Sequence, residues 1–253
     1  MTSDRRTLVA GNWKMHLRRE EAQSYCRKLA ASEPAEGGPE VALFPAFPLI
    51  PVLAAELEDT PIQWGGQDLH PEPSGAHTGD VSAAHLVDWG CRWVLCGHSE
   101  RRRDHGEGDE LVAAKVRAAQ EHGLAPVLCV GETEEERAAG QTNAVLARQL
   151  ESALPDLTRP AALAYEPVWA IGSGQTATPE IAQEAHAFLR QAVSEAADPT
   201  AGQELRILYG GSVNSSNCEI LLAQPDIDGF LIGGASLDSA EFLDIIRRCG
   251  SSG

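Results

Sequence analysis

The sequence contains no run of about 18 consecutive apolar residues, which is the length that a membrane-spanning helix needs. Residues 1–6 include two arginines, but the apolar stretch that follows them, 8–10, is too short for the core of a signal peptide. These two absences argue against a membrane protein and against an exported one. We therefore expect a cytoplasmic protein.

Basic residues are scarce as well. The chain has 20 Lys and Arg residues against 37 Asp and Glu residues, which gives a net charge of -17. Nucleic acids and anionic membrane surfaces bind to basic surfaces, so this balance argues against both as partners. If the ligand is an anion, it must be attracted by local groups rather than by the protein as a whole.

Motifs for metals and nucleotides are also absent. The six cysteines form no CxxC pair and no zinc-ligand spacing, and several lie in apolar segments where a free cysteine behaves as a small hydrophobic residue. The Gly-rich stretch 172–176 lacks the lysine and the spacing of a phosphate-binding P-loop. We expect reduced thiols, no metal site and no nucleotide ligand.

What the sequence does contain is eight short apolar segments, each followed by a polar loop or a helical pattern. Most are continuously apolar rather than alternating, which is typical of parallel strands that are buried on both faces. The strands are expected at 7–14, 41–44, 62–67, 93–97, 126–130, 161–165, 206–209 and 229–232. Helices are expected at 17–31, 49–57, 82–89, 109–122, 179–196, 216–223 and 239–248, with a further helical region opening at 133–136.

Eight strand–helix units without an intervening linker predict one α/β domain over residues 1–253, closed into a (β/α)8 barrel. An open, doubly wound sheet is the alternative. Eight even units without a long insertion favour closure.

In such a barrel, the polar residues that follow the strands gather at one mouth. Each of them alone has a simpler explanation, such as a surface charge, a helix cap or a tight turn. Their joint occurrence at strand ends indicates a site, and the glycine pairs suit a phosphate because glycine lets backbone N–H groups approach an anion closely. The set comprises Asn12, Lys14, Gln67, His98, Glu100, Glu166, Gly210-Gly211-Ser212 and Gly233-Gly234.

Glu166 ends the sixth expected strand and opens a segment with a stiff entry, Pro167, and a glycine-rich tip. A loop built in this way can swing as a lid. A single Glu at a strand end is more often a solvated rim residue, so its importance depends on the other polar residues at the same mouth.

These segments carry a resemblance that extends along nearly the whole chain: the sequence resembles the triosephosphate isomerase family. The matching stretches are 11–15 (GNWKM), 74–80 (SGAHTGD), 96–102 (CGHSERR), 126–133 (PVLCVGET), 164–177 (AYEPVWAIGSGQTA), 209–214 (YGGSVN) and 228–236 (DGFLIGGAS). The resemblance implies a (β/α)8 barrel that interconverts dihydroxyacetone phosphate and glyceraldehyde 3-phosphate through an enediol(ate), without a metal or an organic cofactor.

The resemblance also implies roles for the catalytic residues. Glu166 is expected to move a proton between adjacent carbons, and His98, as a neutral imidazole, to polarise the carbonyl and shuttle protons between oxygens. Lys14 and Asn12 are expected to balance charge on the substrate, with Glu100 as the ion-pair partner of Lys14. Burial is expected to strengthen Glu166 as a base.

The lid of the family corresponds to 167–177 here. The resemblance places the phosphate at Gly172, Ser212, Gly233 and Gly234, and it assigns the lid and its latch to Pro167, Trp169, Ile171, Ser173, Tyr209 and Leu231. Ile171 on the lid and Leu231 on the floor are the expected water-excluding groups. Two lid residues depart from the family pattern: Gln175 replaces a Lys, and Ser173 replaces a Thr.

The family is usually a homodimer, so the resemblance implies that the loop 74–82, with Gly75, His77, Thr78 and Gly79, docks into a partner near Asn12 and Lys14. His77 stands where the family usually has a Phe. Without the resemblance, a solvated loop would be the simpler interpretation.

Two other functions stay open at this stage. One is an isomerase of a slightly larger ketose phosphate, such as a tetrulose phosphate, and the other is a non-catalytic phosphate-binding protein. The intact lid argues against the first, and the presence of Asn12, Lys14, His98 and Glu166 argues against the second.

Overall fold

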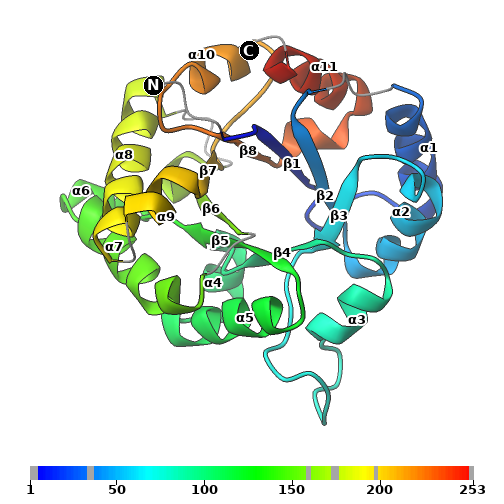
Figure 1. The fold of residues 1–253 in the computed structure, drawn as a ribbon, viewed down its shortest axis with the longest axis horizontal. Coiled ribbons are helices and arrows are strands. Elements are labelled where there is room, and N and C mark those ends of the chain that lie inside the picture. Colours follow the sequence, from blue (N-terminus) through cyan, green and yellow to red (C-terminus); the bar gives the residue numbers. More distant parts are fainter. Residues whose placement is uncertain (1–4, 33–36, 158–160, 172–176, 197–198, 251–253) are drawn as a thin grey trace.

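The computed structural model describes residues 5–32, 37–157, 161–171, 177–196 and 199–250. Its eight strands are parallel and form a closed barrel in sequence order, with β1 paired to both β2 and β8 (Figure 1). The predicted (β/α)8 barrel is confirmed, and the open-sheet alternative is wrong. The strands are β1 (Leu8–Asn12), β2 (Glu40–Phe44), β3 (Gln63–Gly66), β4 (Trp93–Cys96), β5 (Ala125–Val130), β6 (Ala162–Tyr165), β7 (Arg206–Tyr209) and β8 (Gly229–Ile232).

The helices form a ring around the barrel (Figure 1). They are α1 (Arg19–Ala30), α2 (Ile50–Leu57), α3 (Ala83–Asp88), α4 (Ser99–His105), α5 (Asp109–Glu121), α6 (Glu134–Ala138), α7 (Thr142–Ala153), α8 (Pro179–Ala196), α9 (Pro199–Glu204), α10 (Cys218–Leu222) and α11 (Ser239–Gly250). Short 3₁₀ turns occur at η1 (Phe47–Leu49), η2 (Leu154–Asp156), η3 (Val168–Ala170) and η4 (Gly234–Leu237). Within the described ranges, we find no helix with the length and apolar character needed to cross a bilayer.

The two faces of the strands belong to two separate apolar cores. Leu8 and Ala10 of β1 pack inside the barrel with Phe44 and Leu231, whereas Val9 packs outward in the core shared with the helices. Because successive side chains of a strand point to opposite faces, burial of both faces requires apolar residues at every position. This is the physical reason for the uninterrupted apolar runs in the sequence.

The sequence analysis gave no residue range for α4, although this helix carries part of the site. Its sequence, SERRRDH, has no apolar stripe that would indicate a helix. The ends of the helix define it instead: His98 accepts a hydrogen bond from the Glu100 N–H at the start, and Gly106 ends it with a φ of 67°, a conformation that suits glycine.

Candidate active site

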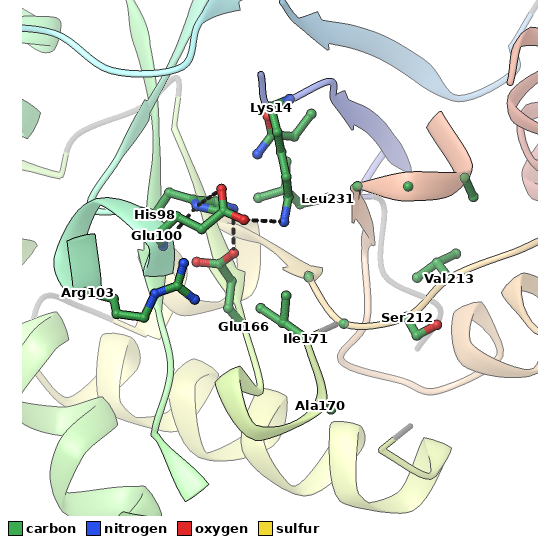
Figure 2. A pocket seen from close by; sticks show the side chains of 16 residues that line it. Lys14, His98, Glu100, Arg103, Glu166, Ala170, Ile171, Ser212, Val213 and Leu231 are labelled. Atoms are coloured by element: carbon green, nitrogen blue, oxygen red, sulfur yellow. Dashed lines mark hydrogen bonds and ion pairs between the residues drawn. The ribbon is translucent and has the colours of Figure 1, made fainter. Parts of the chain in front are cut away.

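The carboxyl ends of the strands surround a pocket of about 530 Å³ (Figure 2). Residues from five strand ends, those of β1, β4, β6, β7 and β8, and from the loops after them contribute to it. Of the polar groups collected from the sequence, all except Gln67 line this pocket. The pocket is lined by Asn12, Lys14, His98, Glu100, Arg103, Glu166, Ala170, Ile171, Gly210, Gly211, Ser212, Val213, Leu231, Gly233, Gly234 and Ala235.

The end of β1 holds Asn12 and Lys14 in a fixed geometry. Asn12 is buried, and its Oδ1 accepts a hydrogen bond of 3.0 Å from the backbone N–H of Lys14. Lys14 has a φ of 50°, an uncommon value for a residue with a side chain. Gln67 supports this turn from β3, because its Nε2 donates to the carbonyl oxygen of Lys14 at 2.8 Å. Strained backbone of this kind persists where the surrounding structure enforces it, as it often does at functional sites.

Lys14 crosses the mouth of the pocket and forms an ion pair with Glu100 of α4, with 2.7 Å between Nζ and Oε1 (Figure 2). Both side chains are only partly buried. The pair joins β1 to the start of α4, and it holds the ammonium group near the centre of the site.

His98 is the residue that precedes α4, and its side chain is buried. Nδ1 accepts a hydrogen bond of 3.2 Å from the backbone N–H of Glu100, so the neutral ring carries its proton on Nε2. Nε2 lies 2.9 Å from Oε1 of Glu166. Burial lowers the pKa of His98, but the carboxylates of Glu166 and Glu100 outweigh this effect, and the net shift is upward.

Glu166 follows β6 and is 2% exposed. In addition to His98, it contacts Ser99, whose backbone N–H donates to Oε2 at 2.8 Å. Burial raises the pKa of Glu166, but His98 and the Ser99 N–H stabilise the charged form, and the net pKa lies below the ordinary value. Burial thus acts in the direction expected from the sequence, toward a stronger base, but the partners of the carboxylate outweigh it in this arrangement.

The first part of the predicted lid is described, and it is held by a buried carboxylate outside the pocket. Trp169 in η3 donates from Nε1 to Oε1 of Glu132 at 2.9 Å, and the Tyr165 hydroxyl donates to the same oxygen at 3.1 Å. Arg137 lies over the ring of Trp169, with 4.3 Å between Cζ and the ring centroid. Pro167 precedes η3, and Ile171 faces the pocket next to Glu166 (Figure 2).

The glycine turns after β7 and β8 lie on the opposite side of the pocket from α4, together with Ser212 (Figure 2). Gly210 packs closely against Glu166, because a Cβ there would stand 3.0 Å from Cγ of Glu166 and would press on that side chain. Gly233 and Gly234 line the pocket at the start of η4, and Leu231 forms part of its wall. The Tyr209 hydroxyl does not line the pocket; it is buried beside the backbone of Ala177.

Two predicted site residues, Gly172 and Ser173, lie outside the described residues, as do Gly174, Gln175 and Thr176. The predictions for them therefore stay predictions.

The loop between β3 and α3 projects beyond the ring of helices (Figure 1). Its tip is exposed in the single chain, including Gly75, His77, Thr78 and Gly79. Gly79 has a φ of 96°, a conformation that a residue with a side chain rarely adopts. The shape suits a docking loop, but dimerisation stays a prediction.

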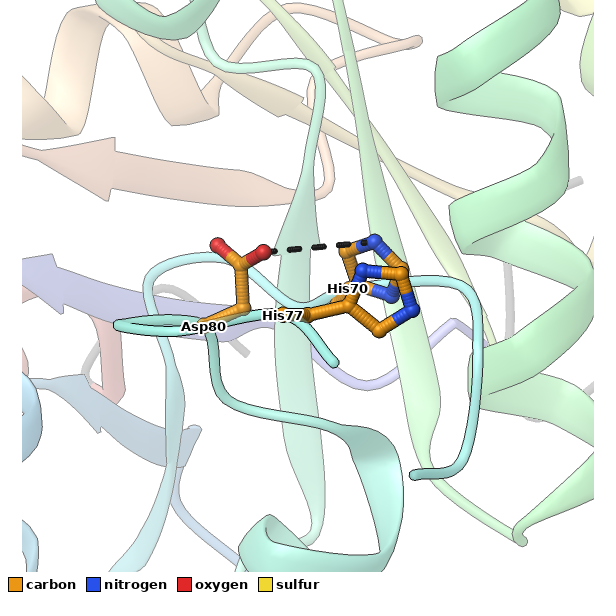
Figure 3. A group of neighbouring side chains, drawn as sticks. All are labelled: His70, His77 and Asp80. Atoms are coloured by element: carbon orange, nitrogen blue, oxygen red, sulfur yellow. Dashed lines mark ion pairs between the residues drawn. The ribbon is translucent and has the colours of Figure 1, made fainter. Parts of the chain in front are cut away.

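Within the described ranges, one group combines three potential metal ligands: His70, His77 and Asp80 (Figure 3). The two imidazole rings are stacked, with 3.8 Å between centroids and an angle of 29°, so their in-plane lone pairs do not converge on one point. Nδ1 of His70 accepts the Glu72 N–H at 3.1 Å, which places the ring proton on Nε2, the atom that faces Asp80. We therefore assign no metal to this group.

Three residues around the site were missed by sequence reasoning: Arg103, Ser99 and Glu132. Arg103 lines the pocket, Ser99 holds Glu166, and Glu132 holds Trp169. Once α4 is known, Arg103 can be found by helical spacing, because it lies three residues after Glu100 on the same face. The roles of Ser99 and Glu132 depend on contacts between distant segments, for which the sequence carries no local signal.

Comparisons with known proteins agree with this geometry. The family model described as triosephosphate isomerase matches residues 7–249. The triosephosphate isomerase of Acidithiobacillus ferrooxidans is 48% identical, over 98% of this chain and 98% of its own length. Its counterpart in Stenotrophomonas maltophilia is 49% identical over 98% and 100%, and that of Thermus thermophilus is 46% identical over 97% and 100%.

Proposed function

The chain belongs to the triosephosphate isomerase family, and from this membership and the geometry of the pocket we propose that it interconverts dihydroxyacetone phosphate and D-glyceraldehyde 3-phosphate. The observation that carries the proposal is the buried contact of 2.9 Å between His98 and Glu166, facing a pocket that also contains Lys14 and two glycine turns. A base, a proton shuttle and a cation around one cavity are the groups that an aldose–ketose isomerisation needs.

In the proposed reaction, Glu166 removes a proton from the carbon next to the carbonyl group. The electron pair of that C–H bond forms the C=C bond of an enediolate, and the carbonyl oxygen becomes negatively charged. His98 donates its Nε2 proton to this oxygen and takes up the proton of the neighbouring hydroxyl. Glu166 then returns its proton to the adjacent carbon, so that no atom is gained or lost.

Lys14 and Asn12 stabilise the charge in this proposal. An ammonium group beside a developing oxyanion in a largely water-excluded pocket stabilises the transition state more than it would in water. Glu100 orients Lys14 through their ion pair of 2.7 Å, and Gln67 fixes the turn on which Lys14 stands. Asn12 already accepts the Lys14 N–H through Oδ1, which leaves its amide NH2 to donate to a substrate oxygen.

The phosphate is placed at the glycine turns, against backbone N–H groups of Gly172, Ser212, Gly233 and Gly234. The lid, residues 167–177, closes over it, with Ile171 and Leu231 excluding water and Tyr209 and Ser212 holding the closed position. Pro167 stiffens the entry to the lid, Trp169 anchors its first turn, and the family resemblance assigns Ser173 to its tip. Exclusion of water matters because a free enediolate can lose its neighbouring phosphate by elimination.

The proposal includes a homodimer in the cytoplasm, in which the loop that carries Gly75, His77, Thr78 and Gly79 docks beside Asn12 and Lys14 of the partner. The exposure of that loop and of Met15, which is 93% exposed next to Lys14, supports this part of the proposal.

The experiment that tests the function is steady-state isomerisation of glyceraldehyde 3-phosphate by the wild-type protein and by Glu166→Gln. We expect fast turnover that falls by about a thousandfold in the variant, the size of a general-base contribution. Binding of inorganic phosphate, measured by calorimetry, should change little because the glycine turns are unaltered. Glu180→Gln, an exposed substitution at the start of α8, is the matched control and should keep full activity.

Each contrary result identifies a different error. A folded wild-type protein that is inactive on the triose but active on a tetrulose phosphate would show that the substrate is wrong. A protein that binds phosphate but converts neither sugar would be a binding protein. Loss of phosphate binding in Glu166→Gln would contradict the separation of the base from the phosphate site.

A further inference from the structure

Arg103 is a cation of the pocket to which the proposed reaction gives no role. It lies on α4, three residues after Glu100, and its side chain lines the pocket. In Figure 2 its guanidinium group is directed toward the centre of the pocket, on the side opposite Ser212, with Glu166 between them. A ligand whose phosphate lies at the glycine turns and whose chain passes Glu166 would approach Arg103.

Arg103 balances the charge of the side chains that line the pocket. Its lining contains two cations, Lys14 and Arg103, and two carboxylates, Glu100 and Glu166. Lys14 is already paired with Glu100 at 2.7 Å. Without Arg103, these side chains would carry a net negative charge, in a chain whose total charge is -17. An anion would then enter against a repulsive field.

Arg103 can be recruited at little cost. Its guanidinium group pairs with Asp104 through bonds of 2.6 and 2.7 Å, and the two side chains are 64% and 49% exposed. Exposed pairs of this kind contribute at most about 1 kcal/mol to stability. Arg103 can therefore exchange Asp104 for a ligand anion, and its planar fork fits a carboxylate or a phosphate with two parallel hydrogen bonds.

We propose that Arg103 forms a second anion-binding position in this pocket, which selects small linear ligands that carry a phosphate at one end and a second anionic group at the other. The inference rests on the proposed function in one respect, which is that the glycine turns hold the phosphate. The pocket has room for such a ligand, because about 530 Å³ lies in the range of cavities that enclose molecules larger than a triose phosphate.

The test compares two ligands that differ at one end, butyl phosphate and 4-phosphooxybutanoate, in which a carboxylate replaces the terminal methyl group. Dissociation constants are measured by isothermal titration calorimetry, which needs no turnover. We expect the wild-type protein to bind the carboxylate ligand more tightly by up to about fivefold, which is the upper limit for one exposed ion pair and is reached when the lost pair with Asp104 contributes little. Arg103→Gln should remove this preference while binding butyl phosphate nearly as well as the wild type does.

The control is Arg27→Gln, which makes the same change of net charge on α1 at a side chain that is 67% exposed and does not line this pocket. It should keep the preference of the wild type, which separates a local effect from a global one. Arg103→Lys should keep part of the preference, because it retains the charge but loses the fork. Asp104→Asn should keep or increase it, since the competing carboxylate is removed.

The outcomes separate this inference from the function on which it rests. If butyl phosphate binds but the carboxylate gives no gain, or if Arg103→Gln keeps the gain, the second anion position is wrong and the phosphate site stands. If Arg27→Gln removes the preference as well, the effect is one of net charge and the assignment to Arg103 is wrong. If butyl phosphate itself does not bind, both the phosphate site and the second position fail.

Discussion

His186 should make the stability of the folded chain depend on pH in a way that one substitution can remove. The side chain is fully buried in α8, between the rings of Tyr165 and Tyr209. Nδ1 lies 3.1 Å from the carbonyl oxygen of Asp226, to which it donates, whereas Nε2 is buried without a hydrogen-bond partner. Protonation would place an unpaired N–H at Nε2 in an apolar environment. Burial accordingly lowers the pKa of His186 from 6.5 to about 4.

The direction and the size of the effect follow from this shift. Above pH 6.5 both the folded and the unfolded states are neutral at this residue, and its contribution to stability is complete. As the pH falls from 6.5 toward 4, the unfolded chain takes up a proton that the folded chain does not, and stability is lost. The loss amounts to about 1.4 kcal/mol at pH 5.5, about 2.5 kcal/mol at pH 4.5, and about 3 kcal/mol at pH 4.

The assay is urea unfolding at one fixed protein concentration between pH 7.5 and 4.5, for the wild type and His186→Asn. Asparagine keeps a donor for the Asp226 carbonyl but does not titrate. The variant is expected to be less stable at pH 7.5 because of lost packing, yet its free energy of unfolding should fall by about 2.5 kcal/mol less than that of the wild type on reaching pH 4.5. The exposed His105→Asn should follow the wild type. Parallel curves for wild type and His186→Asn would refute the reasoning.

Two further predictions concern stability and reactivity. Asp228→Asn should lower the free energy of unfolding by about 3 kcal/mol. The buried carboxylate accepts hydrogen bonds from Arg5 at 2.6 Å and from Arg190 at 2.7 Å, and both cations would lose a charged partner. Urea unfolding at pH 7.5 measures this difference, and a loss below about 1 kcal/mol would contradict the prediction. All six cysteines are buried, and burial raises the pKa of Cys26 and Cys91 to about 12. We therefore expect a thiol reagent to label none of them rapidly at pH 8 until the protein is denatured. Rapid labelling of a native thiol would show that the structure opens locally around that cysteine.

The barrel was predictable from the sequence because each strand–helix unit has its own local pattern and the pattern is repeated eight times. Most strands appear as apolar runs, because both cores demand that pattern; β3, with the sequence QWGG, is the exception among the strands. Another exception is α4, which has no apolar stripe and is defined by caps at its two ends. A cap of this kind depends on the conformation of His98 and Gly106, and composition alone does not reveal it.

The candidate site was predictable in its members but not in its electrostatics. The strand-end rule brought Asn12, Lys14, His98 and Glu166 to one mouth, and the structure places them around one pocket. The rule could not supply the hydrogen bond from Ser99 or the direction of the pKa shift at Glu166, because both depend on which atoms face each other across the barrel. An argument from desolvation alone gave the wrong direction for the net pKa shift of Glu166, because it considered burial and omitted the hydrogen-bond partners of the carboxylate.

The partners of Glu166 also suggest how the pKa of this proposed base can rise when the substrate binds. In the present arrangement the charge of Glu166 is stabilised by His98 at 2.9 Å and by the Ser99 N–H at 2.8 Å. A substrate carbonyl that accepts the Nε2 proton of His98 takes the place of Glu166 as acceptor. Glu166 then loses the largest group that lowers its pKa but stays buried, and burial acts in the opposite direction. The loss of this contact also lowers the pKa of His98, because the carboxylate of Glu166, which raises that pKa, no longer contacts the imidazole. Arrival of the substrate would thus produce the strong base and the neutral imidazole together, and neither needs to exist beforehand.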